Sequence, residues 1–397
     1  MVVRLVQEIE RCMDNTLQPN SSSQDSSSVK PMHLSPTPAM FITSTSDINM
    51  AAPDVNSVTF SRDGTAIVTT TGDEFEGEQA VWIWDAMTGA LLSYIPSRGQ
   101  TVHNAMFNAD GRKLARAFGN RVEVCMADPH YNVTTAECWR WTDQSQCHLS
   151  LEITRPNGDP TGRWDPAKWG YRRWDTERLG LRRSDQSFFN PVPTMFDVAW
   201  HPDDSSLVAA SSDEVARIWD VHSSNVLQIL AGHSAAVRSA RFSPDGTQVV
   251  TASADATARI WDTASGICLR VLSGHVEALN SAEWSPDGTY IVTGCSDGTI
   301  GLWEAHAPDR PPRIEPYEVF AATLASFSPD GTRIATNHGT LVRIWDHRMA
   351  RCEFVLSVES QIPGLGWGIG ALAWSPDSTR LAIGGTNAMV GIWEIGN

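Results

Sequence analysis

The sequence lacks any Cys-x-x-Cys pair, and its seven cysteines are an odd number scattered over 397 residues. Such a set argues against a disulfide framework and does not have the paired spacing of a zinc knuckle. Apolar runs long enough to span a bilayer are also missing. Charged residues interrupt the N-terminal stretch MVVRLVQEIERCM, which therefore does not resemble a signal peptide. These absences predict an intracellular protein with reduced cysteines, in the cytoplasm or alternatively in the nucleus.

Positive charge is scarce, because 30 Lys and Arg stand against 46 Asp and Glu, for a formal net charge of −16 at pH 7. Binding to a phosphate backbone depends on clustered basic residues that release counterions. The composition therefore argues against a general nucleic-acid-binding protein, and only a local basic patch would restore that class of function.

Catalytic signatures are absent as well. The sequence contains no G-x-S-x-G, no H-E-x-x-H and no glycine loop followed by a phosphate-binding Lys. The glycine-rich stretch GLGWGIG at 364–370 has no Lys and no helix signal after it. We therefore expect a protein that is not an enzyme and that has no cofactor, no metal and no small-molecule substrate.

Tryptophan, by contrast, is abundant, with 16 residues against 5 tyrosines, and several of the tryptophans end copies of an internal repeat. ARFSPDGTQVVTASADATARIWD (240–262) and AEWSPDGTYIVTGCSDGTIGLWE (282–304) align without a gap. Five more segments follow the same template, at 58–85, 105–126, 198–220, 325–346 and 372–394. Their turn aspartates are spaced by 42 to 47 residues, except for 93 residues between the second and third copies.

Each copy contains the pattern of three short strands. An alternating apolar run ends at an aromatic residue, and a Pro-Asp-Gly type of turn follows. Two further apolar runs, separated by a short turn with Asp, lead to the closing Trp. The segment after the Trp, for example CLRVLSGH at 268–275, supplies a fourth strand. Strands joined by such tight turns predict an antiparallel meander.

The repeat period, the pairs Gly232-His233 and Gly274-His275 and the Trp-Asp endings resemble the WD40 repeat family, over about residues 55–395. The resemblance implies an all-β fold, a seven-bladed WD40-type β-propeller with four-stranded antiparallel blades. The seventh copy ends at its third strand, and AMFITST at 39–45 is the strand-like run that would complete it. An N-terminal strand would then close the ring and remove an exposed blade edge.

In that family a His, a Ser or Thr, an Asp and a Trp form a buried hydrogen-bonded tetrad. The resemblance assigns two complete sets, which are His233, Thr251, Asp255 and Trp261, and His275, Thr293, Asp297 and Trp303. Because the sets recur at the repeat period, we interpret them as structural rather than catalytic. The other copies depart from the pattern. Cys125 replaces Trp in the second copy, Ala209 replaces the hydroxyl in the third, and Gly-His is confined to the two central copies.

Family members bind partners mainly on the top face of the ring, where the first strand of each blade begins. The residues four positions before each aromatic lie there, namely Asn56, His103, Phe196, Arg238, Asn280, Thr323 and Gly370. Phe196, Arg238 and Asn280 lie on three consecutive blades, and aromatic and Arg side chains are enriched at binding hot spots. We predict that these three residues bind a partner, together with Trp367 in the loop before the last blade. Chance placement on the surface is the alternative.

Residues 1–38 differ in composition from the repeats. The first 13 have apolar residues at helical spacing, which predicts a short amphipathic helix. The Ser- and Pro-rich remainder predicts a flexible linker. The propeller is expected over 39–397.

The anomalous spacing predicts one long insertion, about 127–192, between the second and third blades. Its stretch GRWDPAKWGYRRWD contains two Trp-Asp pairs, but it has neither the preceding turn nor the second apolar strand of a true copy. Region 163–183 carries seven basic residues against three acidic ones. We predict partner contacts from Trp164, Trp169, Arg172, Arg173 and Trp174. Folding back onto a blade and stacking on RNA bases are the alternatives, and nucleic acid is the less favoured because the whole chain is acidic.

These observations together predict a non-catalytic scaffold or adaptor that binds protein partners in a multiprotein complex. A propeller fold does not by itself determine what is bound. Two other functions stay open, which are recognition of a peptide or modified peptide at the channel mouth, and RNA binding through the Trp/Arg-rich insertion.

Overall fold

The computed structural model describes residues 40–43, 54–72, 79–97, 100–119, 121–131, 133, 149–152, 193–223, 225–307, 313–315, 324–349, 351–358, 368–385 and 389–395. The helix and linker predicted for 1–38 lie outside these ranges. Every regular element within them is a β-strand. Accordingly, no helix in the described part of the chain is long and apolar enough to cross a membrane.

The strands form seven four-stranded antiparallel sheets, which we number as blades in chain order. Blade 1 contains β2 (Val55–Phe60), β3 (Ala66–Thr71), β4 (Ala80–Asp85) and β5 (Leu91–Pro96). Blade 2 contains β6 (Val102–Phe107), β7 (Lys113–Phe118), β8 (Arg121–Met126) and β9 (Leu149–Glu152). Blade 3 contains β10 (Met195–Trp200), β11 (Ser206–Ser211), β12 (Val215–Asp220) and β13 (Val226–Ala231).

The second half of the chain repeats the same plan. Blade 4 contains β14 (Val237–Phe242), β15 (Gln248–Ser253), β16 (Thr257–Asp262) and β17 (Cys268–Ser273). Blade 5 contains β18 (Leu279–Trp284), β19 (Tyr290–Cys295), β20 (Ile300–Glu304) and β21 (Arg313–Glu315). Blade 6 contains β22 (Ala325–Phe327), β23 (Arg333–His338), β24 (Leu341–Asp346) and β25 (Cys352–Ser357). Blade 7 contains β26 (Ile369–Trp374), β27 (Arg380–Gly385), β28 (Met389–Glu394) and β1 (Met40–Thr43).

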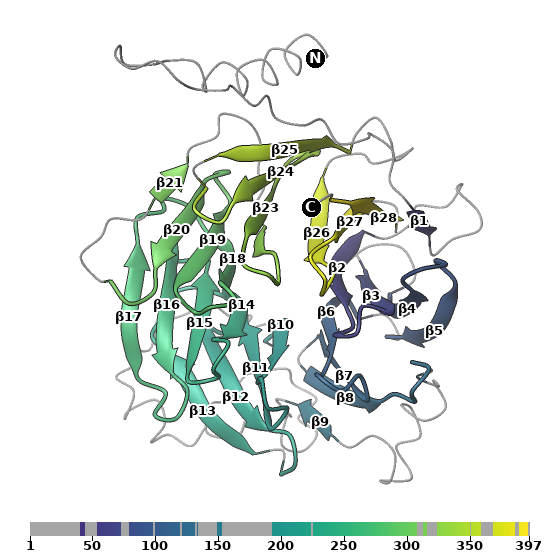
Figure 1. Cartoon of the computed structure of the whole chain (residues 1–397). Helices are drawn as coiled ribbons and strands as arrows, with labels where there is room; N and C mark the ends of the chain where they lie inside the picture. The colour runs from purple at the N-terminus through teal and green to yellow at the C-terminus, as the bar shows by residue number, and fades with distance from the viewer. Residues whose placement is uncertain are drawn as a thin grey trace, which may run out of the picture.

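The blades surround a common centre, with the first strand of each on the inside (Figure 1). Each inner strand contacts the inner strand of the next blade, and β26 of blade 7 contacts β2 of blade 1, so the ring is closed. The predicted seven-bladed propeller with antiparallel blades is confirmed.

The turn between the first two strands of each blade is held by its own side chains. In blade 4, the Ser243 hydroxyl donates to Asp245 Oδ1 over 2.6 Å, and the same oxygen accepts from the Thr247 amide at 3.0 Å. Gly246 follows with φ of 73°, in the region that glycine occupies at little cost. The hydrogen bond from the Ser hydroxyl to the Asp carboxylate recurs in blades 1, 5, 6 and 7. This bond explains why the Ser-x-Asp turn marks the repeat so clearly in the sequence.

The N-terminal strand closes the ring as predicted. β1 pairs antiparallel with β28, with Met40 opposite Ile392 and Thr43 opposite Met389. Ile42 is only 2% exposed and belongs to the apolar cluster shared by blades 7 and 1. The last blade is therefore made from both ends of the described chain.

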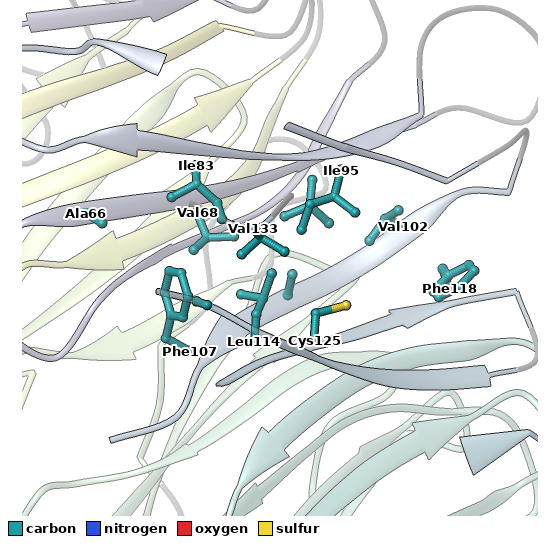
Figure 2. Packing of buried hydrophobic residues seen from close by; sticks show 13 residues of the cluster. Ala66, Val68, Ile83, Ile95, Val102, Phe107, Leu114, Phe118, Cys125 and Val133 are labelled. Carbon is teal, nitrogen blue, oxygen red and sulfur yellow. The ribbon is translucent and has the colours of Figure 1, made fainter. Parts of the chain in front are cut away.

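The apolar cores lie between neighbouring blades. The cluster between blades 1 and 2 joins Val68 and Ile83 of blade 1 to Phe107 and Leu114 of blade 2 (Figure 2). Cys125, at the position where other blades have Trp, is fully buried there. A smaller side chain at this position leaves room for other residues of the same cluster.

Part of that room is taken by the start of the segment predicted as an insertion. Val133 is buried in the same cluster, and its amide and carbonyl both bond the Ser93 hydroxyl of β5. β9 also lies within 127–192 and pairs with β8 as the outer strand of blade 2. The long connection to blade 3 therefore begins after Glu152, and residues 153–192 lie outside the described ranges.

Candidate functional site

The residues predicted for the top face share one structural feature. Each is the second residue of its inner strand, and in each the pairing with the next strand skips that residue, so that it is the extra residue of a β-bulge. The described positions are Asn56, His103, Phe196, Arg238, Asn280 and Gly370. Bulges redirect a side chain out of the regular alternation of a strand. We call these six residues the bulge ring.

The bulge ring contains contacts between neighbouring blades. The His103 and Phe196 rings meet edge to face with centroids 5.3 Å apart. The Arg238 Nη1 group donates a hydrogen bond to Asn280 Oδ1, and Asn280 Nδ2 donates to Ser296 Oγ at 3.2 Å. Asn56 Nδ2 donates to the Val102 carbonyl of the next blade at 3.0 Å. The predicted residues Phe196, Arg238 and Asn280 therefore lie on one face of the ring.

The exposure of these side chains suits contact with a partner. Arg238 is exposed, whereas Phe196 and Asn280 are half-buried. A guanidinium has five N–H donors, and the bond to Asn280 uses one nitrogen of Arg238. Arg238 therefore keeps donors for a carboxylate or a carbonyl. Trp367, Trp164, Trp169, Arg172, Arg173 and Trp174 lie outside the described residues, and their predicted contacts stay predictions.

Beneath this face, blade 4 holds the hydrogen-bonded set that the sequence suggested. His233 Nδ1 lies 2.8 Å from Asp255 Oδ2, and His233 Nε2 lies 2.7 Å from Thr251 Oγ1. Trp261 Nε1 donates to the same Thr251 oxygen at 2.9 Å. These bonds join the loop before β14 to β15 and β16, so the set holds the blade together.

Burial and hydrogen bonding fix the protonation of this set. Burial lowers the pKa of His233, against the opposing effect of Asp255. Burial raises the pKa of the Asp255 carboxyl, but hydrogen bonds from Thr257 and His233 have the larger combined effect and lower this pKa to about 2. At neutral pH the pair is a neutral imidazole and a carboxylate, which suits a fixed structural link.

Comparison with known proteins agrees with this geometry. The family model described as "WD domain, G-beta repeat" matches residues 191–220, 224–262, 266–304 and 361–394, which fall on blades 3, 4, 5 and 7. The chain is a WD40-repeat β-propeller. The remaining blades of this WD40 propeller are shown by the seven sheets rather than by the family model.

Similar curated proteins are called Denticleless protein homolog. The protein from Gallus gallus is 41% identical over 49 residues, 12% of this chain and 7% of that protein. The Xenopus tropicalis protein is 34% identical over 58 residues, 15% and 8% of the two chains, and the Danio rerio protein 42% over 48 residues, 12% and 7%. The matches span less than a tenth of these relatives, so the likeness covers little more than one WD40 repeat.

Blade 5 of the WD40 propeller differs from blade 4 in one link. His275 Nε2 lies 2.8 Å from Thr293 Oγ1, to which Trp303 Nε1 donates at 2.9 Å. His275 Nδ1, however, lies 2.9 Å from Thr299 Oγ1, and that hydroxyl donates to Asp297 Oδ1 at 2.6 Å. Asp297 thus joins the set through Thr299.

In two other blades the Trp indole also donates to a Thr hydroxyl, and these sets contain residues that were not predicted from the sequence. In blade 6, His338 comes from β23 itself and lies 3.0 Å from Thr336 Oγ1, to which Trp345 donates. Burial, reinforced by the Arg343 charge, lowers the pKa of His338 to about 3. In blade 1, Trp84 Nε1 donates to Thr69 Oγ1 at 3.0 Å.

Blades 2 and 3 use buried ion pairs. In blade 2, Arg116 occupies the strand position of Thr251 and forms a salt bridge of 2.6 Å with Glu123, with side chains 0% and 3% exposed. In blade 3, Arg217 pairs with Asp213 through two hydrogen bonds of 3.1 and 2.6 Å. All four residues are charged, and charged residues in a sequence usually indicate positions on the surface.

A second polar network links the inner strands. Asp197 of β10 accepts hydrogen bonds from Asn104 of β6 and from Arg241 of β14, and also from the Ala240 amide at 3.1 Å. Glu283 of β18 continues the series, and burial raises its pKa to about 7 against the effects of Ser326 and Arg241. We call these residues the inner belt. It ties successive blades together.

Proposed function

We propose that this WD40 propeller is a non-catalytic scaffold that holds protein partners in a multiprotein complex, and that the bulge ring is its principal contact surface. One observation carries the proposal. In six blades the second residue of the inner strand is a β-bulge residue, and these residues lie on one face of the closed propeller. Fixed strands present these side chains, so binding orders few new groups, and the entropic cost of contact is low.

The chemistry of the ring favours a protein partner with an acidic or carbonyl-rich segment. Phe196 and His103 offer a half-buried aromatic surface, and Arg238 offers an exposed guanidinium at the same position of the neighbouring blade. An aromatic anchor beside an Arg is the composition of interface hot spots. The same observation favours the narrower alternative, in which the ring recognises a short peptide at the channel mouth.

Replacing Phe196 and Arg238 together by Ala is expected to remove the main partner. Loss of each hot-spot side chain costs about 2 kcal/mol, which corresponds to about 30-fold in affinity for each. Tagged wild-type and variant chains would be purified from cells at equal expression, and the co-purified proteins quantified by mass spectrometry. Leu269→Ala is the matched control, because Leu269 is 52% exposed but lies on an outer strand.

The control is expected to retain the partner list of the wild type. An unchanged list from the Phe196/Arg238 variant, with an unchanged Tm, would contradict the proposed surface. A chain lacking residues 153–192 keeps β9 and β10 and separates the contribution of the connection. Crosslinking to RNA, with Arg172 and Arg173 changed to Ala, tests the RNA alternative, which requires RNA recovery that these changes abolish.

A further inference from the structure

Three metal-ligating side chains of different kinds meet at the top of blade 5. They are His275 from the connection between β17 and β18, Cys295 at the end of β19, and Asp297 in the turn to β20. The His275 ring nitrogen, the Cys295 sulfur and an Asp297 carboxylate oxygen all lie within 4.8 Å of one another. His275 and Cys295 are buried, whereas Asp297 is half-buried.

Blade 4 provides an internal comparison, because its residues occupy the same positions of the repeat. His233 corresponds to His275 and Asp255 to Asp297, but Ser253 stands where blade 5 has Cys295. A serine hydroxyl is a weak ligand for zinc, while a thiolate is among the strongest. Blade 5 therefore has the complete set of donors, and blade 4 lacks one of them.

A second difference between the blades concerns charge. Opposite the tetrad Thr, blade 4 has Arg259, and its positive charge contributes to lowering the pKa of His233. The matching residue of blade 5 is Gly301. The charge that acts on His275 is that of Asp297. A cation is repelled by Arg259 in blade 4, whereas in blade 5 the Asp297 carboxylate attracts it.

Gly301 lies directly against the histidine and its hydrogen-bond partner. A Cβ atom at this position would lie 2.6 Å from Thr293 Oγ1 and 2.7 Å from His275 Nε2, which is too close for any side chain.

Binding of an ion at His275 Nδ1 requires a change of tautomer, because Nδ1 now contacts the Thr299 hydroxyl, which itself donates to Asp297. Nε2 can donate to Thr293 Oγ1, because the Thr293 hydroxyl has the Gly301 carbonyl as its own acceptor at 3.4 Å. Nδ1 would then carry the lone pair, and the ion would take the place of its present contact with Thr299 Oγ1 at 2.9 Å. A ligating histidine is commonly oriented by such a bond from its other nitrogen. In blade 4 an ion at Nδ1 would have to displace the Asp255 carboxylate, which lies 2.8 Å from that nitrogen, rather than a neutral hydroxyl.

We propose that His275 Nδ1, Cys295 Sγ and one Asp297 carboxylate oxygen bind a zinc ion, with a water in the fourth position. Binding converts the Cys295 thiol to a thiolate, and the proton is released to solvent. The site lies beside the bulge ring, since Ser296, between the two ligands, bonds Asn280. The ion would fix the turn that supports this part of the contact surface.

Cobalt(II) is the probe, because a thiolate ligand gives a charge-transfer band and a tetrahedral ion gives intense visible absorption. The full chain, stripped with a chelator, is expected to bind one equivalent of Co²⁺ with both features, and Zn²⁺ should displace it. Cys295→Ser, which gives blade 5 the residue of blade 4, is expected to abolish the charge-transfer band. Its affinity should fall by more than the 10- to 100-fold that is usual for loss of an outer-shell partner.

Cys268→Ser is the matched control, because Cys268 is a half-buried thiol of β17 outside the cluster. It is expected to keep the full spectrum. No band in the folded wild type, or a band that survives Cys295→Ser, would overturn the proposal. If Cys295→Ser does not fold, Asp297→Asn takes its place, and an unchanged cobalt affinity in that variant would likewise overturn it.

Discussion

Arg116→Met is expected to lower the free energy of unfolding by about 3 kcal/mol, because it removes the closest partner of the buried Glu123 carboxylate and leaves only the longer contact of 3.9 Å to Arg121. The salt bridge is 2.6 Å long and both side chains are almost fully buried in blade 2. Urea denaturation followed by tryptophan fluorescence measures this change, since tryptophans lie in the cores of neighbouring blades.

The double variant Arg116→Met, Glu123→Leu separates a lost bridge from damaged packing. It is expected to recover most of the lost stability, because two apolar side chains can replace a buried ion pair at little cost. The control is Arg333→Met, whose bridge of 3.0 Å to Glu353 is more exposed and is worth about 1 kcal/mol or less. Equal losses for Arg116→Met and Arg333→Met would contradict the structural role of the buried pair.

Ile42→Ala is expected to destabilise the protein by about 2–5 kcal/mol, the range for truncating a buried Ile. The site is unusual because β1 is the strand that closes the ring, so the change weakens the joint between blades 7 and 1. Leu91→Ala is the matched control. Leu91 is also aliphatic and lies at the start of an outer strand, but it is 48% exposed.

Leu91→Ala should therefore change stability by no more than about 0.5 kcal/mol. Thermal unfolding of both variants compares the two positions directly. A Tm for Ile42→Ala equal to that of Leu91→Ala would mean that closure by β1 contributes nothing to the fold.

The repeat made most of the fold predictable. In turns such as Ser243 to Gly246 the side chains form hydrogen bonds within the turn, so the same residue types recur in most blades. The apolar pattern then sets the strands between them. The closing strand was also predictable, because the seventh copy lacks an outer strand and one apolar run precedes the first copy.

Outer strands were harder to locate, and β9 shows why. An outer strand has a neighbour on one edge only, so few of its residues are constrained by packing. β8 and β9 are separated by 22 residues, whereas β16 and β17 are separated by five. Neither its spacing nor its sequence LSLE distinguishes it from the rest of the predicted insertion.

The candidate site was predictable in position but not in contacts. Counting back from each aromatic located Phe196 and Arg238, because the bulge has the same place in every inner strand. The inner belt was missed, since Asp197 and Arg241 come from different blades and have no common spacing to other acids and bases. Arg116 and Glu123 were missed because charged residues on adjacent strands usually lie on a surface.

The central claim is that partners contact the bulge ring, and photocrosslinking tests it most directly. A photoreactive amino acid would be placed at position 196 in one chain and at position 269 on the outer strand in another. We expect that the partner lost from the Phe196/Arg238 variant is captured covalently from position 196 and not from position 269. Capture from position 269 alone would contradict it.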